Sequence, residues 1–452
     1  MTSEMASGGD TQKRFLIAIT FVYLLVNLSF LAFSVPTITL VEADALTLYR
    51  MAMQFLNEGT FLEEQRQPLY PLLLSGVFWI FGPDQFLGVI SVQIGLLYLT
   101  GITIWHIAKN WIPAYAHWIF ALTIFNPNAL GNAHMPLADT LFAFLVTMAV
   151  WCLFRFALNG KLIAIPFLGL ALGLAALTRP EGKYLIYLVP LAAPLLTISA
   201  GRLGQAPMGL LCGIVALGIA YSVALPWMMH NEAAGHGLSL SSGSKASENA
   251  RGHFALVESA RQNREQREII ADLKKAEKIL LVETGLEEAS AEEVRNYLFG
   301  HYIKRIFSSD VLVLTNLYTK AWIAQFVSGG AQTINQLLGV EKSSSDKIMN
   351  QDNWMERFFD GLKNQTGVGS LITISCILFA LVLRVAGLIG VIVLLLRKHW
   401  PLLLMVVALI AFKAVIHLFY GLSRYRLPVE PLLMVLAVYG FDGIRVAISK
   451  RQ

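Results

Sequence analysis

The chain has 452 residues, of which 56% are hydrophobic and only 14% carry a charge. Soluble domains carry roughly 25% charged residues, so this composition excludes an ordinary soluble protein and predicts an all-α polytopic membrane protein. The net charge of +5 does not indicate a nucleic-acid partner, because the basic residues gather at the ends of apolar segments. All three cysteines fall inside apolar segments, which predicts neither a disulfide nor a zinc site.

Eleven apolar segments are candidates for membrane-spanning helices, which need roughly 20 mostly apolar residues. Lys13 and Arg14 precede the first of them and predict an uncleaved signal-anchor with a cytoplasmic N-terminus. Four further basic groups mark cytoplasmic ends: Arg155 with Lys161, Arg202, Arg397 with Lys398, and Arg445 with Lys450 and Arg451. The segments are 14–34, 68–82, 87–108, 112–129, 136–157, 161–178, 183–199, 207–229, 370–396, 400–420 and 428–446.

The order of the segments raises a problem of parity. Three apolar segments separate residue 66 from Asp139, yet this topology expects both positions outside. One segment therefore does not span, which leaves ten or eleven spans. Segment 68–82 is short and opens with Pro68, which favours an interfacial or half-inserted helix. Segment 112–129 is the other candidate.

Residues 231–367 differ in kind from the apolar blocks on either side. Residues 239–252 are rich in Ser, Gly and Asn, and residues 254–307 are charged with a helical pattern. Residues 312–328 are apolar again, but Lys320 in their middle argues against a span. We expect a helical extracytoplasmic insertion that lies on the membrane. It separates an N-terminal transmembrane module (1–230, with a first outer loop at 35–66) from C-terminal transmembrane helices (368–452).

The first outer loop carries two acids, Glu42 and Asp44. A bilayer surface needs no acid there, whereas glycosyl transfer does, because a carboxylate acts as general base on an acceptor hydroxyl or holds a divalent cation. The alternative is a solvated loop in which Asp44 caps a helix N-terminus. The chemistry-based interpretation makes Asp44 or Glu42 the catalytic carboxylate.

Residues 126–140 place His134 and Asp139 just outside an apolar helix. Asp139 is either a first-turn acid favoured by the helix dipole or a second carboxylate that converges with Asp44 on one site. In the second case, Asp139 and His134 are the candidate ligands of a divalent cation, Mg²⁺ or Mn²⁺.

Basic residues at two outer turns run against the usual charge bias. Arg179 suits bidentate contact with phosphate, the alternative being a solvated Arg–Glu pair. Arg424 and Arg426 follow a helix on which Lys413 lies inside the bilayer, where an unpaired charge costs several kcal/mol. The only acid within a few residues is Glu430, so we expect a lipid phosphate as their partner. Snorkelling of Lys413 to the interface is the alternative.

Five motifs in this order resemble the GT-C superfamily of polyprenyl-phosphate-sugar-dependent glycosyltransferases, which includes protein O-mannosyltransferases and lipid A aminoarabinose transferases. The resemblance covers roughly 14–235 and 370–440. The matching stretches are Asp44 with Tyr49 and Ala52, Gln67-Pro68-Leu69-Tyr70, residues 173–182, Leu225-Pro226-Trp227 with Asn231 and Gly235, and residues 424–431. Two departures stand out. Asp44-Ala45 replaces the Asp-Glu or Asp-Asp of many relatives, and Gln67 replaces a basic residue.

The resemblance implies a GT-C-like bundle in the bacterial inner membrane, with an extracytoplasmic active site, inversion at the anomeric carbon and a lipid-phosphate leaving group. The donor would be a polyprenyl-phosphate-linked sugar, and the acceptor an envelope glycan, lipid or protein. Asp44 would remove the acceptor's proton, while Arg179, Arg424, Arg426 and Lys413 would stabilise the departing phosphate. A flippase or transporter of a lipid-linked sugar is the alternative function, with the same charges along a translocation path.

Overall fold

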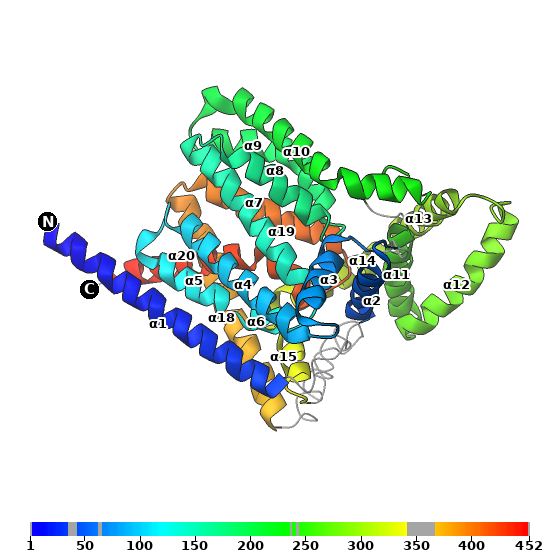
Figure 1. Cartoon of the computed structure of the whole chain (residues 1–452), viewed down its shortest axis with the longest axis horizontal. Helices are drawn as coiled ribbons and strands as arrows, with labels where there is room; N and C mark the ends of the chain where they lie inside the picture. Colours follow the sequence, from blue (N-terminus) through cyan, green and yellow to red (C-terminus); the bar gives the residue numbers. More distant parts are fainter. Residues whose placement is uncertain are drawn as a thin grey trace.

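The computed structural model describes residues 2–34, 43–61, 66–235, 237–240, 244–340 and 367–450. Every regular element in these ranges is a helix, which confirms the all-α prediction (Figure 1). Eight of these helices are long and apolar enough to cross a membrane. They are α1 (Thr2–Ser34), α4 (Phe86–Ala108), α7 (Asp139–Asn159), α9 (Gly182–Ser199), α10 (Ala206–Ala233, preceded by η3 at Leu203–Gln205), α18 (Gly367–Leu396), α19 (Trp400–His417) and α20 (Glu430–Ser449).

The other three predicted segments form shorter helices, which do not meet this length criterion. Segments 68–82 and 161–178 contain α3 (Leu69–Phe81) and α8 (Ala164–Ala176), each with 13 residues. Such a helix is about 20 Å long, short of the roughly 30 Å hydrocarbon core. Segment 112–129 divides into η2 (Pro113–Tyr115), α5 (Ala116–Ile124) and the start of α6 (Pro127–Ala133).

Both ends of α3 lie beside α2 (Ala43–Glu58). Arg66, before α3, forms an ion pair with Asp44, and Asp84, after α3, accepts a hydrogen bond from Tyr49. Asp44 and Tyr49 are five residues apart on α2, about 7.5 Å along its axis. A helix whose two ends both contact so short a stretch does not cross a bilayer. This geometry supports segment 68–82, not 112–129, as the one that does not span.

The two ends of the bundle differ in chemistry. At one end, Arg202 donates hydrogen bonds to the carbonyl oxygens of Phe156 and Ala157 at the end of α7, and Arg397 pairs with Asp442. The two chain termini lie at this same end (Figure 1). The basic residues that predict the cytoplasmic side therefore gather together, and the opposite end carries the starts of α7 and α9 and the end of α19.

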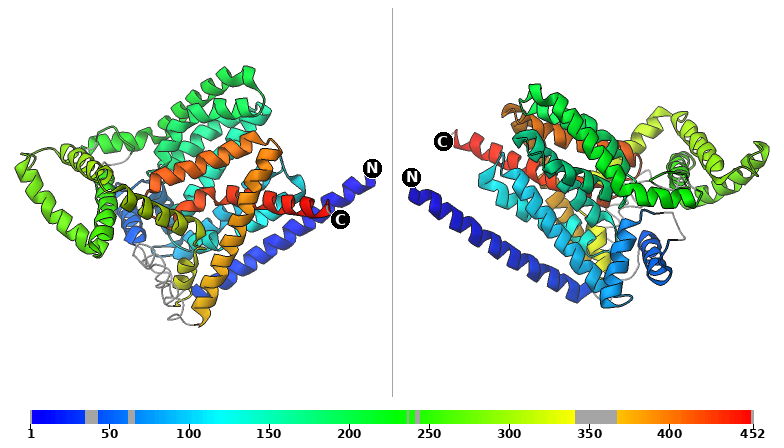
Figure 2. Two further views of the ribbon diagram at one scale, coloured as in Figure 1. Left: turned by 180° about the vertical axis from the view of Figure 1, so that it is seen from behind. Right: turned by 45° about the horizontal axis from the view of Figure 1, so that its top comes forward.

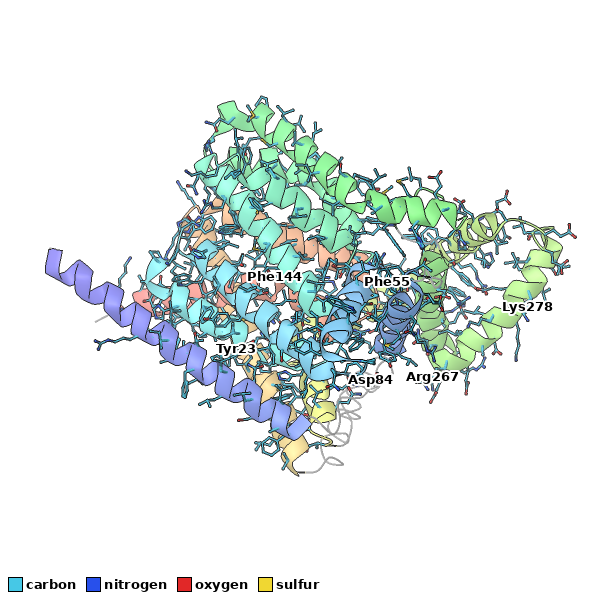
Figure 3. The ribbon with its side chains drawn as sticks, in the orientation of Figure 1. Tyr23, Phe55, Asp84, Phe144, Arg267 and Lys278 are labelled. Carbon is cyan, nitrogen blue, oxygen red and sulfur yellow. The ribbon has the colours of Figure 1, made fainter. Side chains whose placement is uncertain are left out.

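The described part of the predicted insertion is helical, as expected, and residues 341–366 of it lie outside the described residues. It contains α11 (Ser244–Gln262), α12 (Gln266–Glu283), α13 (Ala291–Phe307), α14 (Val311–Val327) and α15 (Ala331–Leu337). Helices α11 to α13 project beyond the bundle (Figure 2), and charged side chains such as Arg267 and Lys278 stand on the outlying α12 (Figure 3). Helices α11, α13 and α14 share a small core that includes Phe254, Tyr302 and Leu317. Phe419, just after α19, packs into that core and ties the insertion to the bundle.

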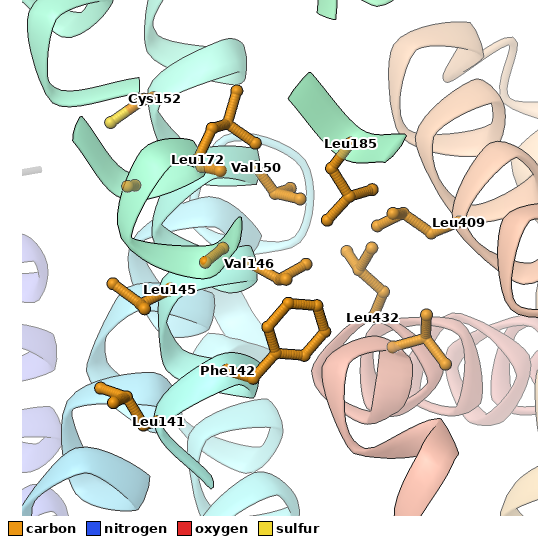
Figure 4. Packing of buried hydrophobic residues seen from close by; sticks show 14 of the residues in the cluster. Leu141, Phe142, Leu145, Val146, Val150, Cys152, Leu172, Leu185, Leu409 and Leu432 are labelled. Carbon is orange, nitrogen blue, oxygen red and sulfur yellow. The ribbon is translucent and has the colours of Figure 1, made fainter. Parts of the chain in front are cut away.

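The main core lies between α7 and its neighbours. Phe142, Val146 and Val150 on α7 face Leu185 on α9 and Leu409 on α19 (Figure 4). Because these side chains are apolar and buried, the bundle around them is rigid and close-packed.

Candidate functional site

Charged side chains from five segments far apart in the sequence meet at the end of the bundle opposite the termini. They are contributed by α2, the approach to α3, the start of α7, the turn between α8 and α9, and the end of α19 with the following turn η4 (Ser423–Val429). Direct ion pairs connect them in two groups. We call this set the ionic cluster: Asp44, Arg66, Asp139, Arg179, Glu181, Lys413, His417 and Arg424.

Glu181 is the hub of the first group. Its carboxylate lies 3.1 Å from Nε of Arg179, 2.7 Å from Nζ of Lys413 and 2.8 Å from Nε2 of His417. Arg179 reaches further and pairs with Asp139. Burial alone would raise the pKa of Glu181, but the charges of Lys413 and Arg179 outweigh it and hold that pKa well below its ordinary value. The carboxylate is therefore a permanent anion that orients three cationic or polar groups.

The local sequence explains why Arg179 and Glu181 stand side by side. Pro180 lies between them in the turn, and Gly182 begins α9. A Cβ at Gly182 would lie 2.5 Å from the carbonyl oxygen of Ala175, so only glycine allows α9 to start this close to α8. The Arg-Pro-Glu-Gly stretch is thus a tight reversal that presents two opposite charges at the end of the bundle.

Tyr425 joins the two groups of the ionic cluster. Its ring stacks on His417 with centroids 4.1 Å apart and planes 5° from parallel. The guanidinium carbons of Arg179 and Arg424 each lie 5.5 Å from the Tyr425 ring centroid. Arg424 in turn pairs with Asp44 at 3.0 Å. Two cations that repel one another are therefore held beside one aromatic ring, each anchored by a carboxylate on its other side.

Members of the ionic cluster differ in access. The side chains of Asp44 and Arg66 are 33% and 24% exposed, and those of Arg179 and Arg424 are 18% and 15% exposed. Lys413 is only 1% exposed. Asp139 and Glu181 are buried as well. A bound molecule can thus reach Asp44 and the two arginines, whereas the buried members support them from behind.

Arg426 lies outside the ionic cluster. It pairs with Glu430, which also binds Arg384 at 2.9 Å. Its remaining donors reach the carbonyl oxygens of Gln325 and Ser328 at the end of α14, the latter at 2.7 Å. We call Arg384, Arg426 and Glu430 the buried triad, after its two buried members Arg426 and Glu430; Arg384 is half-buried. Its protein partners occupy the guanidinium of Arg426, the residue predicted to face a lipid phosphate.

Lys413, which we expected to face a lipid phosphate, pairs with a carboxylate of the protein. Glu430 is the only acid within a few residues in the sequence, but a distant acid lies closer in space. Glu181, 232 positions away in the sequence, supplies the compensating carboxylate to both Lys413 and His417. Lys413 does not snorkel to the interface, because its ammonium group is buried against that acid.

The predicted metal ligands do not form a site in the described residues. No group of three or more His, Cys, Asp or Glu side chains suited to a metal ion is found among them. Nδ1 of His134 lies 2.9 Å from the carbonyl oxygen of Leu130, and the His134 ring packs on Phe30. Asp139 is held by Arg179. Glu42, the alternative catalytic carboxylate, lies outside the described residues.

An apolar cavity begins next to the ionic cluster. It lies between α7, α8, α9 and α19 and has a volume of about 520 Å³, including space open to the surroundings. Its wall includes Phe412, the residue before Lys413, and Leu185, one turn after Glu181. Val146, Val150 and Leu409 also line it (Figure 4). Charged and apolar surfaces therefore adjoin within one or two helical turns.

Three contributors had no role assigned to them from the sequence. Arg66 holds Asp44, Tyr425 joins the two arginines, and Glu181 organises the centre. All three belong to motifs that carried the resemblance or lie directly beside one, so the motifs did contain the signal. Their roles follow only from contacts between segments distant in the sequence.

Comparison with known proteins adds no relative. No model of a known protein family matches the chain, and no curated protein sequence matches it. The likeness to GT-C glycosyltransferases therefore rests on the five sequence motifs and remains a prediction.

Proposed function

We propose that this chain is a membrane glycosyltransferase that moves a sugar from a polyprenyl-phosphate donor to an acceptor hydroxyl, with inversion. The observation that carries the proposal is the ionic cluster, with Asp44, Arg179 and Arg424 within reach of a ligand, directly beside an apolar cavity. A lipid-linked phosphate needs such a pair of surfaces: cations for the head and an apolar wall for the chain. The site would face the extracytoplasmic side of a bacterial inner membrane.

Asp44 is the base in this proposal. Of the three carboxylates in the ionic cluster it is the most exposed, at 33%, so an acceptor hydroxyl can approach it. The hydroxyl gives its proton to Asp44 while its oxygen bonds to the anomeric carbon and the bond from that carbon to the phosphate oxygen breaks. The acceptor is an envelope glycan, lipid or protein.

Arg179 and Arg424 stabilise the charge that develops on the leaving phosphate. Both are partly exposed and lie on the same Tyr425 ring, so one phosphate can contact both guanidinium groups. Lys413 and Asp139 act indirectly, because Lys413 fixes Glu181 and Asp139 fixes Arg179. The proposal gives Arg426 no contact with the donor, since its partners are Glu430 and two backbone carbonyls.

No step of this mechanism passes through a metal ion. The side chains predicted to bind Mg²⁺ or Mn²⁺, His134 and Asp139, already have protein partners and do not belong to a group of metal-ligating residues in the described chain. The two arginines supply the positive charge at the phosphate instead.

One observation favours the second candidate function, a flippase or transporter of the same lipid. The buried triad extends the series of charges away from the ionic cluster into the bundle, as a translocation path requires. Against it, Arg426 and Glu430 are 1% and 2% exposed and engage one another, so a passing headgroup has no route to them.

The experiment uses the purified protein in proteoliposomes with a radiolabelled polyprenyl-phosphate sugar. A glycosyltransferase releases polyprenyl phosphate and labels an acceptor in envelope extracts, and Asp44→Asn abolishes this while donor binding persists. A transporter instead moves intact donor between leaflets without breaking the sugar–phosphate bond. Intact donor after prolonged incubation with a full envelope extract would overturn the proposal, and glycan analysis of the host with and without the protein would name the sugar.

A further inference from the structure

The insertion carries an exposed apolar surface at the corner where α13 ends and α14 begins. Phe307, Val311 and Leu312 are 79%, 72% and 78% exposed, although the surrounding insertion is rich in charge. We call these three residues the apolar corner. Asp310 caps α14 by accepting a hydrogen bond from the backbone N–H of Leu312 at 2.7 Å. The cap holds the corner in a defined turn, so its exposure is a built feature of the fold.

The apolar corner lies close to the membrane-spanning bundle. Six residues further along α14, the hydroxyl of Tyr318 donates to the carbonyl oxygen of Ala414 at 3.5 Å. Ala414 belongs to the last turn of α19, one of the eight potential spans. Six residues of helix correspond to about 9 Å, so Leu312 lies within about two helical turns of the end of a spanning helix. At that distance from the end of a spanning helix, the apolar corner is close to the lipid headgroups, where the apolar membrane interior meets water.

The charges around the corner fit a lipid surface. Lys304 and Arg305 occupy the last turn of α13 and are both exposed. Arg305 also lies over the ring of Phe254, with its guanidinium carbon 4.2 Å from the centroid. Basic side chains beside large apolar ones are the composition of segments that lie in the interface of an anionic membrane.

The size of the corner argues against a protein partner. Stable protein interfaces bury about 800 Å² on each side, far more than three side chains provide. Moving exposed Phe, Val and Leu side chains out of water is favourable, which suffices for a tether that is already attached at both ends.

We propose that the apolar corner inserts into the headgroup region of the bilayer and holds the insertion down on the membrane. The partner is a lipid surface with anionic headgroups, and the inference does not depend on the proposed glycosyltransferase activity. One consequence concerns α11, whose His253 packs on Tyr420 with ring centroids 4.4 Å apart. An anchored insertion keeps α11 pressed on the loop that follows α19 and leads into Arg424.

The test places a nitroxide spin label at three positions of the full chain in lipid nanodiscs. The three native cysteines, all buried, are first replaced by alanine, and the background must keep its melting temperature. Leu312→Cys reports on the corner. Leu388→Cys on α18, 70% exposed, is the lipid-facing control, and Glu287→Cys in the exposed α12–α13 turn is the aqueous control. Phe307→Cys repeats the measurement if Leu312→Cys fails to fold.

The expected result is that the label at 312 resembles the label at 388, with oxygen reaching it several-fold better than a water-soluble nickel complex. In discs with phosphatidylglycerol, Lys304→Glu should move the label toward water, and in pure phosphatidylcholine it should not. A label at 312 that behaves like the label at 287 would overturn the proposal. A label shielded from both reagents would overturn it as well, because it would show that protein covers the corner.

Discussion

The ionic cluster and the buried triad contain the same types of residue but differ in what those residues contact. Each joins arginines to carboxylates from segments distant in the sequence. In the triad, Arg426 is 1% exposed and its donors reach Glu430 and the backbone of α14. In the cluster, Arg179 and Arg424 keep 18% and 15% of their surface exposed and lie on an aromatic ring. The difference lies in Arg426, which protein partners enclose, whereas Arg179 and Arg424 keep exposed surface that a ligand can reach. Arg384, at 14%, is as exposed as Arg424.

The largest expected effect is the loss of stability when the buried triad is disrupted. Glu430→Gln removes the negative charge between Arg384 and Arg426, and leaves the buried Arg426 and the half-buried Arg384 without that counter-charge. Breaking a buried ion pair this way costs about 3–5 kcal/mol. We expect a strongly lowered melting temperature and poor recovery of folded protein in detergent. Glu287→Gln in the exposed α12–α13 turn is the matched control, and equal melting temperatures for the two variants would contradict the assignment.

The second prediction tests Asp44, the proposed base in the ionic cluster. Asp44→Asn removes the base, and general-base catalysis contributes about 10²–10⁴-fold, so transfer should fall by that factor. Its ion pairs are partly exposed, so the loss of stability should stay within about 1 kcal/mol. Turnover and melting temperature are measured together, with Glu58→Gln, exposed on the same helix, as the control. Near-normal turnover would transfer the role to Glu42.

A third pair of variants contrasts two arginines that are neighbours in sequence. Arg424→Ala should weaken binding of the donor lipid by about 10–100-fold with little change in melting temperature, since a charged hydrogen bond contributes about 1.5–3 kcal/mol. Arg424→Lys should restore only part of the affinity because the planar fork is lost. Arg426→Ala should do the reverse and lower stability first. If Arg424→Ala leaves donor affinity unchanged, Arg424 has no role at the phosphate.

The last prediction concerns the contact between the insertion and the site. Burial, and then the nearby His417, lower the pKa of His253 from 6.5 to about 4. Below pH 6.5, His253 therefore binds a proton in the unfolded chain but not in the folded chain, so the free energy of unfolding falls as the pH drops from 6.5 toward 4. The total decrease in the free energy of unfolding is about 3 kcal/mol.

Melting temperatures between pH 7.5 and 4.5 measure this loss, and His253→Gln should flatten the curve in that window. An unchanged slope in the variant would mean that another group is responsible. Glu181 does not contribute here, because its lowered pKa means that its stabilisation is lost only at more acidic pH.

Much of the architecture was predictable because it depends on local composition. The apolar segments, the short segment opened by Pro68 and the helical insertion all follow from hydropathy, length and periodicity. Asp44, Asp139 and Arg179 were also singled out, since charges at the ends of apolar helices are costly without a use. Segments 161–178 and 112–129 form helices that are short or interrupted, so they are not among the eight long apolar helices of the described chain.

The sequence by itself determined that the chain is a helical membrane protein and which charges stand at the ends of its helices. Tertiary structure alone decided how those charges pair. Lys413 meets Glu181 across 232 positions because α9 and α19 pack together, which no local pattern reveals. Arg424 and Arg426 look equivalent in sequence, yet they lie in a 3₁₀ helix with about three residues per turn. Two residues there differ by about 240° in direction, so Arg424 turns to Asp44 and Arg426 to Glu430.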